Sequence, residues 1–221
     1  MSKAIVLLSG GLDSATTLYY ARKRGFKVFC LIFDYGQRHK KEIAQAVRIA
    51  EASHSGYSVL NICLPQKGSA LLEKRLVLPK GKASPLNKIP STYVPSRNIV
   101  FLSLAASYAE VLNADTVFIG ANAIDYSGYP DCRPEFMNAF QKALDAGTKA
   151  GVEGKRIKIA APLINKTKSQ IVEMASKLKV PLHLTWSCYR GGKRPCGVCD
   201  SCVLREKGFQ EAGIIDPAIG K

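Results

Sequence analysis

The sequence predicts an α/β fold: a Rossmann-like parallel sheet of five strands with helices on both faces. Two observations support this prediction. Apolar runs typical of strands alternate with segments of helical periodicity along most of the chain. These runs are continuously apolar rather than alternating, which is typical of parallel strands buried on both faces. Sheets of this kind bind ligands at the carboxyl ends of their strands.

The predicted strands are short apolar runs bounded by turn-forming residues. Gly10 and Gly11 follow the first run, Pro65 ends the third, and Gly120 ends the fourth. We expect strands over residues 4–8, 28–33, 59–63, 115–119 and 157–160.

The segments between these runs have the spacing of helices. Ile43, Val47 and Ala50 share one helical face, and Pro134 suits the first position of another helix. Thr167 and Gln170 form a capping box before the last predicted helix. We expect helices over residues 14–24, 40–52, 97–112, 134–150 and 167–178, then a cysteine-rich segment and a short tail.

One long stretch, residues 66–95, carries many lysines and four prolines without a long periodic run. A loop of this length in a compact domain is usually a functional lid or disordered.

The composition is that of one globular domain with a small appendage. The chain has 221 residues, of which 47% are hydrophobic and 22% charged, which excludes a disordered chain, a collagen and a disulfide scaffold. No apolar stretch reaches the roughly 20 residues of a membrane span, and the run 4–8 is too short for a signal peptide, so we expect a cytoplasmic protein. The net charge of +15 favours anionic partners such as nucleotides or nucleic acid, although the basic residues are spread as on an ordinary surface.

The residues between the first strand and the first helix form a candidate phosphate-binding loop. Two glycines allow positive φ and close approach of a ligand, and the helix N-terminus offers free N–H groups. Asp13 suits this site if Mg²⁺ accompanies a triphosphate; the alternative is a turn with Asp13 as the helix cap. The candidate residues are Leu8, Ser9, Gly10, Gly11, Leu12, Asp13 and Ser14.

A lysine at a second helix N-terminus is a further candidate for phosphate binding. Lys168 directly follows the capping residue Thr167, and Lys166 competes with it for this role. The alternative for either lysine is a solvated place on the surface.

Four cysteines near the C-terminus predict a metal site. Four thiolates form the closed tetrahedral shell of structural Zn²⁺, and a reduced cytoplasmic protein favours metal over disulfides. An iron–sulfur cluster and a redox disulfide are the alternatives, but the spacing lacks the closing Cys-Pro of bacterial ferredoxins. The cluster consists of Cys188, Cys196, Cys199 and Cys202.

Several stretches together resemble the 7-cyano-7-deazaguanine synthase family, which belongs to the PP-loop ATP pyrophosphatase superfamily and makes a precursor of queuosine and archaeosine. The matching stretches read L-S-G-G-L-D-S, F-D-Y-G-Q-R-H, V-P-S-R-N, G-A-N-A-I-D-Y-S-G-Y-P-D-C-R-P-E-F and P-L-I-N-K-T-K, and the four cysteines match too. They span nearly the whole chain, and no motif position departs from the family pattern.

The resemblance implies a ligase reaction with two activations by ATP. The carboxylate of 7-carboxy-7-deazaguanine attacks the α-phosphate of ATP, and ammonia converts the acyl-adenylate to an amide. A second activation gives the nitrile. The resemblance also implies Mg²⁺ with ATP and a homodimer. The cysteine spacing predicts one structural Zn²⁺ per subunit, and we expect no membrane and no stable nucleic-acid partner.

We expect the chain to divide into two parts. We expect a PP-loop ATP-binding α/β domain over residues 1–185, including the long loop 66–95. A C-terminal zinc-binding segment over residues 186–221 would pack on the same domain.

The candidate catalytic residues are Asp13, Lys168 and Arg97. Arg97 or Arg133 would hold the substrate carboxylate or the adenylate phosphate, because a guanidinium grips such oxygens in a fork.

The guanine-like edge of the substrate presents N–H donors that a carboxylate would pair with. Asp131 or Glu135 is the first candidate for that carboxylate, and Asp125 is the third. Tyr126, Tyr129 or Phe136 would stack on the base; a purely structural role is the alternative for each of these aromatic residues.

Three other functions remain open at this point. A tRNA-modifying PP-loop enzyme of the thiolation or lysidine type would explain the basic charge, but 221 residues leave little room for an RNA-binding domain. A zinc-ribbon binding module would not turn over ATP. An amidotransferase would need a glutaminase nucleophile, for which no sequence context is apparent, so free ammonia is the expected nitrogen donor.

Overall fold

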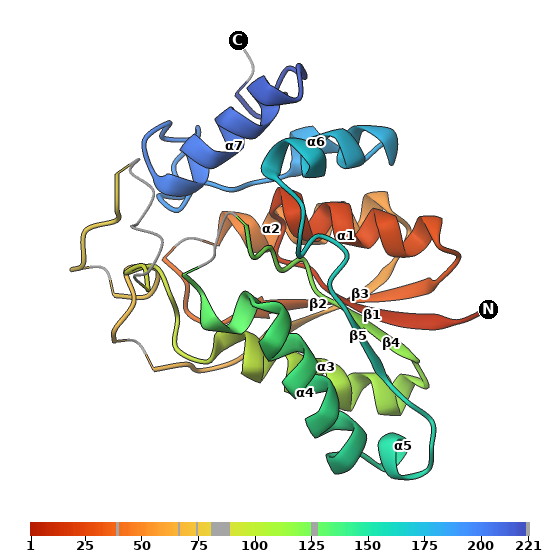
Figure 1. Ribbon diagram of the computed structural model, residues 1–221. Helices are drawn as coiled ribbons and strands as arrows, with labels where there is room; N and C mark the ends of the chain where they lie inside the picture. Colours follow the sequence, from red (N-terminus) through yellow and green to blue (C-terminus); the bar gives the residue numbers. More distant parts are fainter. Residues whose placement is uncertain (39, 66, 74, 81–88, 125–127, 220–221) are drawn as a thin grey trace.

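The computed structural model describes residues 1–219 except 39, 66, 74, 81–88 and 125–127. Its centre is one parallel sheet in the order β3-β2-β1-β4-β5 (Figure 1). The strand bounds are Lys3–Leu7 for β1, Lys27–Asp34 for β2, Gly56–Asn61 for β3, Thr116–Phe118 for β4 and Lys158–Ala160 for β5. The predicted fold class is confirmed.

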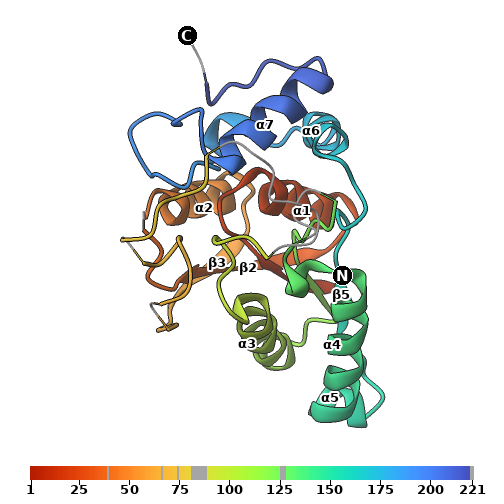
Figure 2. The same cartoon turned by 60° about the vertical axis from the view of Figure 1, so that its left-hand side comes forward.

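Helices cover both faces of the sheet. Helices α1 (Leu12–Lys23) and α2 (Lys41–Ala52) lie on one face, with α6 (Lys168–Lys177) and α7 (Asp200–Glu211) stacked beyond them (Figures 1 and 2). The opposite face carries α3 (Arg97–Leu112) and α4 (Pro134–Gly147). Short helical turns complete the fold: η1 (Pro130–Cys132), α5 (Lys149–Val152) and η2 (Leu182–Leu184).

The alternation of side chains along the central strand creates two cores. In β1, Ile5 and Leu7 face the core shared with α3, whereas Ala4 and Val6 face the core shared with α1, α2 and α6. Burying one such leucine or isoleucine side chain contributes about 1.5–3 kcal/mol. The central strands are therefore fixed from both sides, and so are the loops at their carboxyl ends.

The structure corrects three details of the prediction. Strand β3 begins three residues earlier than expected and lies at the sheet edge, so Tyr57 and Val59 are exposed rather than buried on both faces. The helix expected over 134–150 ends at Gly147, and α5 follows it. Helix α7 was expected to be part of a cysteine segment and tail; its buried positions are mostly polar or small, so no apolar periodicity marks it.

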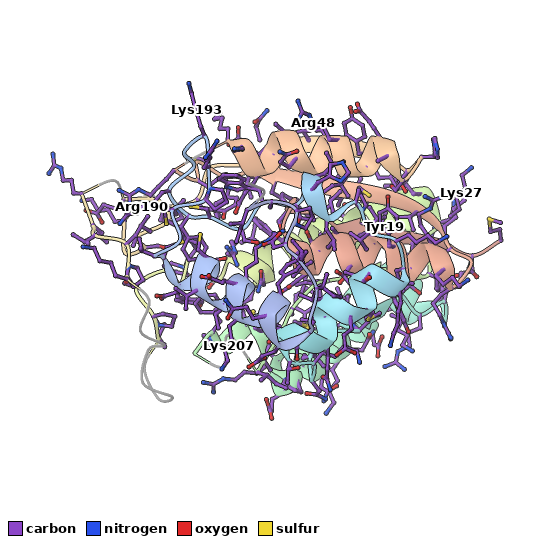
Figure 3. The ribbon with its side chains drawn as sticks, turned by 90° about the horizontal axis from the view of Figure 1, so that it is seen from above. Tyr19, Lys27, Arg48, Arg190, Lys193 and Lys207 are labelled. Atoms are coloured by element: carbon purple, nitrogen blue, oxygen red, sulfur yellow. The ribbon has the colours of Figure 1, made fainter. Side chains whose placement is uncertain are left out.

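Within the part of the chain that the structure describes, no helix combines the length and apolar character needed to span a bilayer. The basic side chains are distributed over the surface. Viewed from above, the exposed Lys27, Arg48, Arg190, Lys193 and Lys207 come from β2, α2, the segment before α7, and α7 itself (Figure 3).

Candidate active site

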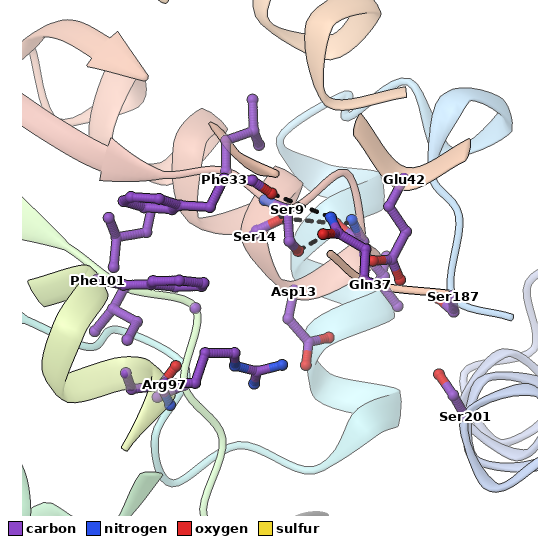
Figure 4. A pocket seen from close by; sticks show the side chains of 18 of the residues that line it. Ser9, Asp13, Ser14, Phe33, Gln37, Glu42, Arg97, Phe101, Ser187 and Ser201 are labelled. Atoms are coloured by element: carbon purple, nitrogen blue, oxygen red, sulfur yellow. Dashed lines mark hydrogen bonds between the residues drawn. The ribbon is translucent and has the colours of Figure 1, made fainter. Parts of the chain in front are cut away.

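A cavity of about 240 Å³ lies at the carboxyl ends of β1, β2 and β4, where a parallel sheet is expected to bind its ligand. Leu7 in β1, Phe33 in β2 and Ile119, directly after β4, line it. Side chains from α1, α2, α3 and the C-terminal segment complete the walls (Figure 4). The cavity therefore unites residues from both ends of the chain.

The candidate phosphate-binding loop of residues 8–14, here called the glycine loop, forms the floor of the cavity. Helix α1 begins after Gly11, and no side chain caps it, so its first N–H groups are available to an anion. The hydroxyl groups of Ser9 and Ser14 lie 3.0 Å apart (Figure 4). Gly10 has a φ of +84°, and a Cβ there would collide with the carbonyl oxygen of Glu42. This loop can cradle a phosphate.

Asp13 does not cap helix α1; it forms an ion pair instead. Lys168 Nζ donates hydrogen bonds to both carboxylate oxygens of Asp13, each at 2.9 Å. Lys168 is the first residue of α6, after the capping box of Thr167 and Gln170 that the sequence predicted. Its side chain is 9% exposed. The structure thus brings Lys168, and not Lys166, to the cavity wall.

Arg97 enters the cavity from the start of α3. Ser96 before it is in the left-handed region with a φ of +55°, which costs a non-glycine residue of order 1 kcal/mol. Arg97 Nη1 donates to the hydroxyl of Tyr35 at 3.3 Å, and Figure 4 shows the guanidinium on the same side of the cavity as Phe101. The ring of Phe101 stacks on Phe33 with centroids 4.1 Å apart, forming a flat apolar wall.

The candidate substrate residues lie in different places. Asp131 is buried but outside the cavity lining: its Oδ2 accepts from the backbone N–H of Asn98 at 3.1 Å, which holds the start of α3. Burial raises the pKa of Asp131. Arg133 and Glu135 are exposed and outside the lining. Asp125 and Tyr126 lie outside the described residues.

Of the candidate aromatic residues that the structure describes, Tyr129 lines the cavity. Its hydroxyl lies 2.6 Å from that of Thr92. Phe136 packs near Phe140 on α4, with ring centroids 5.8 Å apart, and is outside the lining.

The C-terminal segment forms a wall that sequence reasoning missed. The backbone N–H of Trp186 donates to the carbonyl oxygen of Gly10 at 2.9 Å. Lys41 Nζ lies 3.5 Å from the centre of the Trp186 ring. Arg205 is buried in this wall; its guanidinium pairs with Asp216 at 2.6 Å and donates to Ser187 Oγ at 3.2 Å. The segment is therefore tied directly to the glycine loop.

The cysteine cluster lies behind this wall. The four Sγ atoms are all within 4.8 Å of one another, and those of Cys196 and Cys202 are 4.0 Å apart. Gly197 turns between two of them with a φ of +70°, as expected for a tight C-x2-C turn. Hydrogen bonds from Cys199 and Cys202 lower the pKa of the Cys188 thiol. These residues fit a metal ion bound by four sulfur ligands.

The fold and the glycine loop together define an α/β protein with an anion-binding loop after its first strand. The model of the family described as "Queuosine biosynthesis protein QueC" matches residues 3–213. The chain belongs to this family.

Full-length relatives agree with this assignment. A protein of Acetivibrio thermocellus called 7-cyano-7-deazaguanine synthase is 54% identical over 220 residues, which cover 98% of this chain and 96% of the relative. A protein of the same name from Picrophilus torridus is 54% identical over 217 residues, covering 98% and 90%.

A solved structure shares the fold at much lower identity. The predicted subunit of tRNA methyltransferase from Methanocaldococcus jannaschii aligns with a TM-score of 0.50 and 14% identity, covering 80% of this chain and 75% of that one. This likeness concerns the fold alone.

Proposed function

We propose that the protein is an ATP-dependent carbon–nitrogen ligase that converts 7-carboxy-7-deazaguanine and ammonia to 7-cyano-7-deazaguanine. The observation that carries this proposal is the match to relatives of that name, at 54% identity over 98% of the chain. The cavity supports it, because one space contains an anion-binding loop, an arginine and a flat apolar wall. The same full-length match argues against the tRNA-modifying alternative.

The residues of the glycine loop would hold the phosphates of ATP. The free N–H groups at the start of α1 and the hydroxyls of Ser9 and Ser14 can donate hydrogen bonds to phosphate oxygens. Lys168 would stabilise the charge that develops on the leaving pyrophosphate. The Asp13 carboxylate, held in place by Lys168, supplies the oxygen ligands that Mg²⁺ prefers, and bound Mg²⁺ would neutralise phosphate charge.

The substrate would lie between the phosphates and the far wall of the cavity. The guanidinium of Arg97 can grip the carboxylate that attacks ATP, or the phosphate of the adenylate. The stacked pair of Phe33 and Phe101 offers a flat surface to a planar base. Holding both reactants in one cavity makes the attack effectively intramolecular.

The cysteine cluster would bind structural Zn²⁺, since four thiolates leave no open position for chemistry. A homodimer, a cytoplasmic location, the lack of a nucleic-acid partner and the division at residue 185 also stay proposals. The candidates for substrate binding stay Asp125, Asp131, Arg133, Glu135 and Tyr126. The buried Asp131 would contribute indirectly, by holding the start of α3, which carries Arg97.

An assay of the products tests the proposal. The protein is incubated with ATP, Mg²⁺, ammonium and 7-carboxy-7-deazaguanine, and phosphorus NMR and mass spectrometry follow the products. AMP, pyrophosphate and a nitrile are expected. AMP with neither the amide nor the nitrile would contradict the proposed substrate, and intact ATP would contradict the proposed class.

A further inference from the structure

Glu42 lines the cavity as a carboxylic acid, and unlike Asp13 it is not held in an ion pair with Lys168. It is the second residue of α2, and its backbone packs directly against Gly10 of the glycine loop. Its partly buried side chain lines the cavity together with Asp13 and Arg97 (Figure 4). Among the residues that the structure describes, none forms a hydrogen bond or an ion pair with the Glu42 carboxylate.

The other described acids and thiols of the cavity are poor candidates for accepting a proton. Asp13 is held by two hydrogen bonds from Lys168. Burial raises the pKa of the Cys132 thiol to about 12, and burial also raises the pKa of Tyr35, so both stay neutral at physiological pH. Among the described carboxylic acids and thiols of the lining, Glu42 is the group left for proton transfer.

The surroundings of Glu42 suit this task. Burial raises the pKa of Glu42. The guanidinium of Arg97 on α3 partly opposes this effect, and the pKa is about 8. The negative charge of the Cys188 thiolate in the C-terminal segment raises the pKa of Glu42 further, and Tyr35 after β2 also faces Glu42. A general base works best when its pKa lies near the operating pH.

We propose that Glu42 is the general base of the step in which ammonia reacts with the acyl-adenylate; this inference rests on the proposed function. A carbon–nitrogen bond forms at the acyl carbon. The bond from that carbon to the AMP oxygen breaks, and its electron pair leaves with AMP. One N–H proton passes to a carboxylate oxygen of Glu42, so that amide, AMP and the protonated acid result.

The test separates the two half-reactions. Exchange of pyrophosphate into ATP, measured with 7-carboxy-7-deazaguanine and without ammonia, reports adenylation. Amide formation after addition of ammonium reports the second step. Glu42→Gln should retain the exchange and slow amide formation about 10²–10⁴-fold, the usual contribution of a general base. Glu51→Gln, at the exposed far end of the same helix, is the matched control and should change neither rate.

The possible outcomes distinguish this inference from the proposed function. Amide formation at the wild-type rate in Glu42→Gln would overturn the role of Glu42, and so would an equal loss of exchange and amide formation. The absence of exchange in the wild-type protein would instead contradict the proposed function.

A second measurement needs no variant. Hydroxylamine replaces ammonia as the nucleophile, because it is already neutral at pH 7. Its own protonation therefore does not affect how the reaction rate depends on pH above that value. The rate of its reaction with the adenylate should rise with pH, reach half its maximum near pH 8, the pKa of Glu42, and level off at higher pH. A flat profile from pH 7 to 9 would overturn the inference.

Discussion

The two walls of the cavity are held in different ways. The loop wall, residues 8–14, consists mainly of backbone at the end of a central strand and the start of α1. The C-terminal wall, residues 186–205, is held by side chains: the ion pair of Arg205 with Asp216, the contact of Lys41 with Trp186, and the cysteine cluster. The sheet fixes the first wall, whereas a few single contacts fix the second. Substitutions should therefore loosen the walls separately.

The largest effect is expected at Asp216. Its removal in Asp216→Ala leaves the Arg205 guanidinium buried without its ion-pair partner, since both side chains are only 5% exposed. Breaking a buried pair in this way costs about 3–5 kcal/mol. The free energy of unfolding, measured by urea denaturation, should fall by that amount.

Glu211→Ala is the control for Asp216→Ala. It breaks the exposed ion pair of Lys207 and Glu211 on α7, the helix that carries Arg205. This pair contributes less than about 1 kcal/mol. If both variants lost equally little stability, side-chain pairing would not be what holds the C-terminal wall.

The loop wall should be most sensitive at Gly10. An alanine there must adopt the left-handed region and push its Cβ against the carbonyl of Glu42. The strain and overpacking together cost about 2–4 kcal/mol, and binding of ATP should be lost. Calorimetry would measure both quantities.

Gly25→Ala separates strain from packing in this experiment. Gly25 has a similar φ of +87°, but a Cβ there meets no atom within 4 Å. The control should lose only about 1–2 kcal/mol and still bind ATP. Equal losses in both variants would show that the fit of the loop against α2 is unimportant.

The sequence predicted the two walls unequally, for a physical reason. The loop wall depends on local features, namely two glycines between an apolar run and a helix, and these predicted its residues. The Thr167 and Gln170 pair likewise predicted the capping box of α6. The C-terminal wall depends on α7, whose buried face includes Ser201, Arg205 and Gly208. Such a face has no apolar period, so neither the helix nor the position of Arg205 could be predicted.

Glu42 and Asp131 show the same limit at the level of single residues. A glutamate in an amphipathic helix is normally a surface residue, and only the contact of α2 with Gly10 brings Glu42 to the cavity. Asp131 belongs to a polar loop that pointed to substrate binding, but its carboxylate accepts a backbone N–H of α3 instead. Both positions depend on tertiary contacts between distant segments.

A metal-free cluster should loosen the C-terminal wall and leave the sheet intact. Cys199→Ser removes one of four sulfur ligands, so the bound metal measured by mass spectrometry should be lost. Ser187 and Tyr189 would then be less well positioned, and we expect ATP to bind about tenfold more weakly, or ~1.4 kcal/mol.

Cys63→Ser is the control for the metal experiment, because Cys63 is exposed and outside the cluster. It should keep both the metal and the ATP affinity. Unchanged ATP affinity in metal-free Cys199→Ser would mean that the wall keeps its shape without the ion.

The last expected effect concerns the pH dependence of stability at the loop wall. The pKa of Glu42 is raised to about 8 in the folded protein and is near 4.5 in the unfolded chain, so the folded state binds more protons between these values. The contribution of Glu42 to stability is therefore fully present at acidic pH and declines as pH rises from about 5 to 8. Glu42→Gln removes this decline, and the difference in unfolding free energy between variant and wild type should grow by about 1.4 kcal/mol per pH unit between these two pKa values. A difference that stays constant from pH 5 to 8 would mean that the acid titrates at an ordinary pKa, and would weaken the case that the cavity prepares Glu42 for proton transfer.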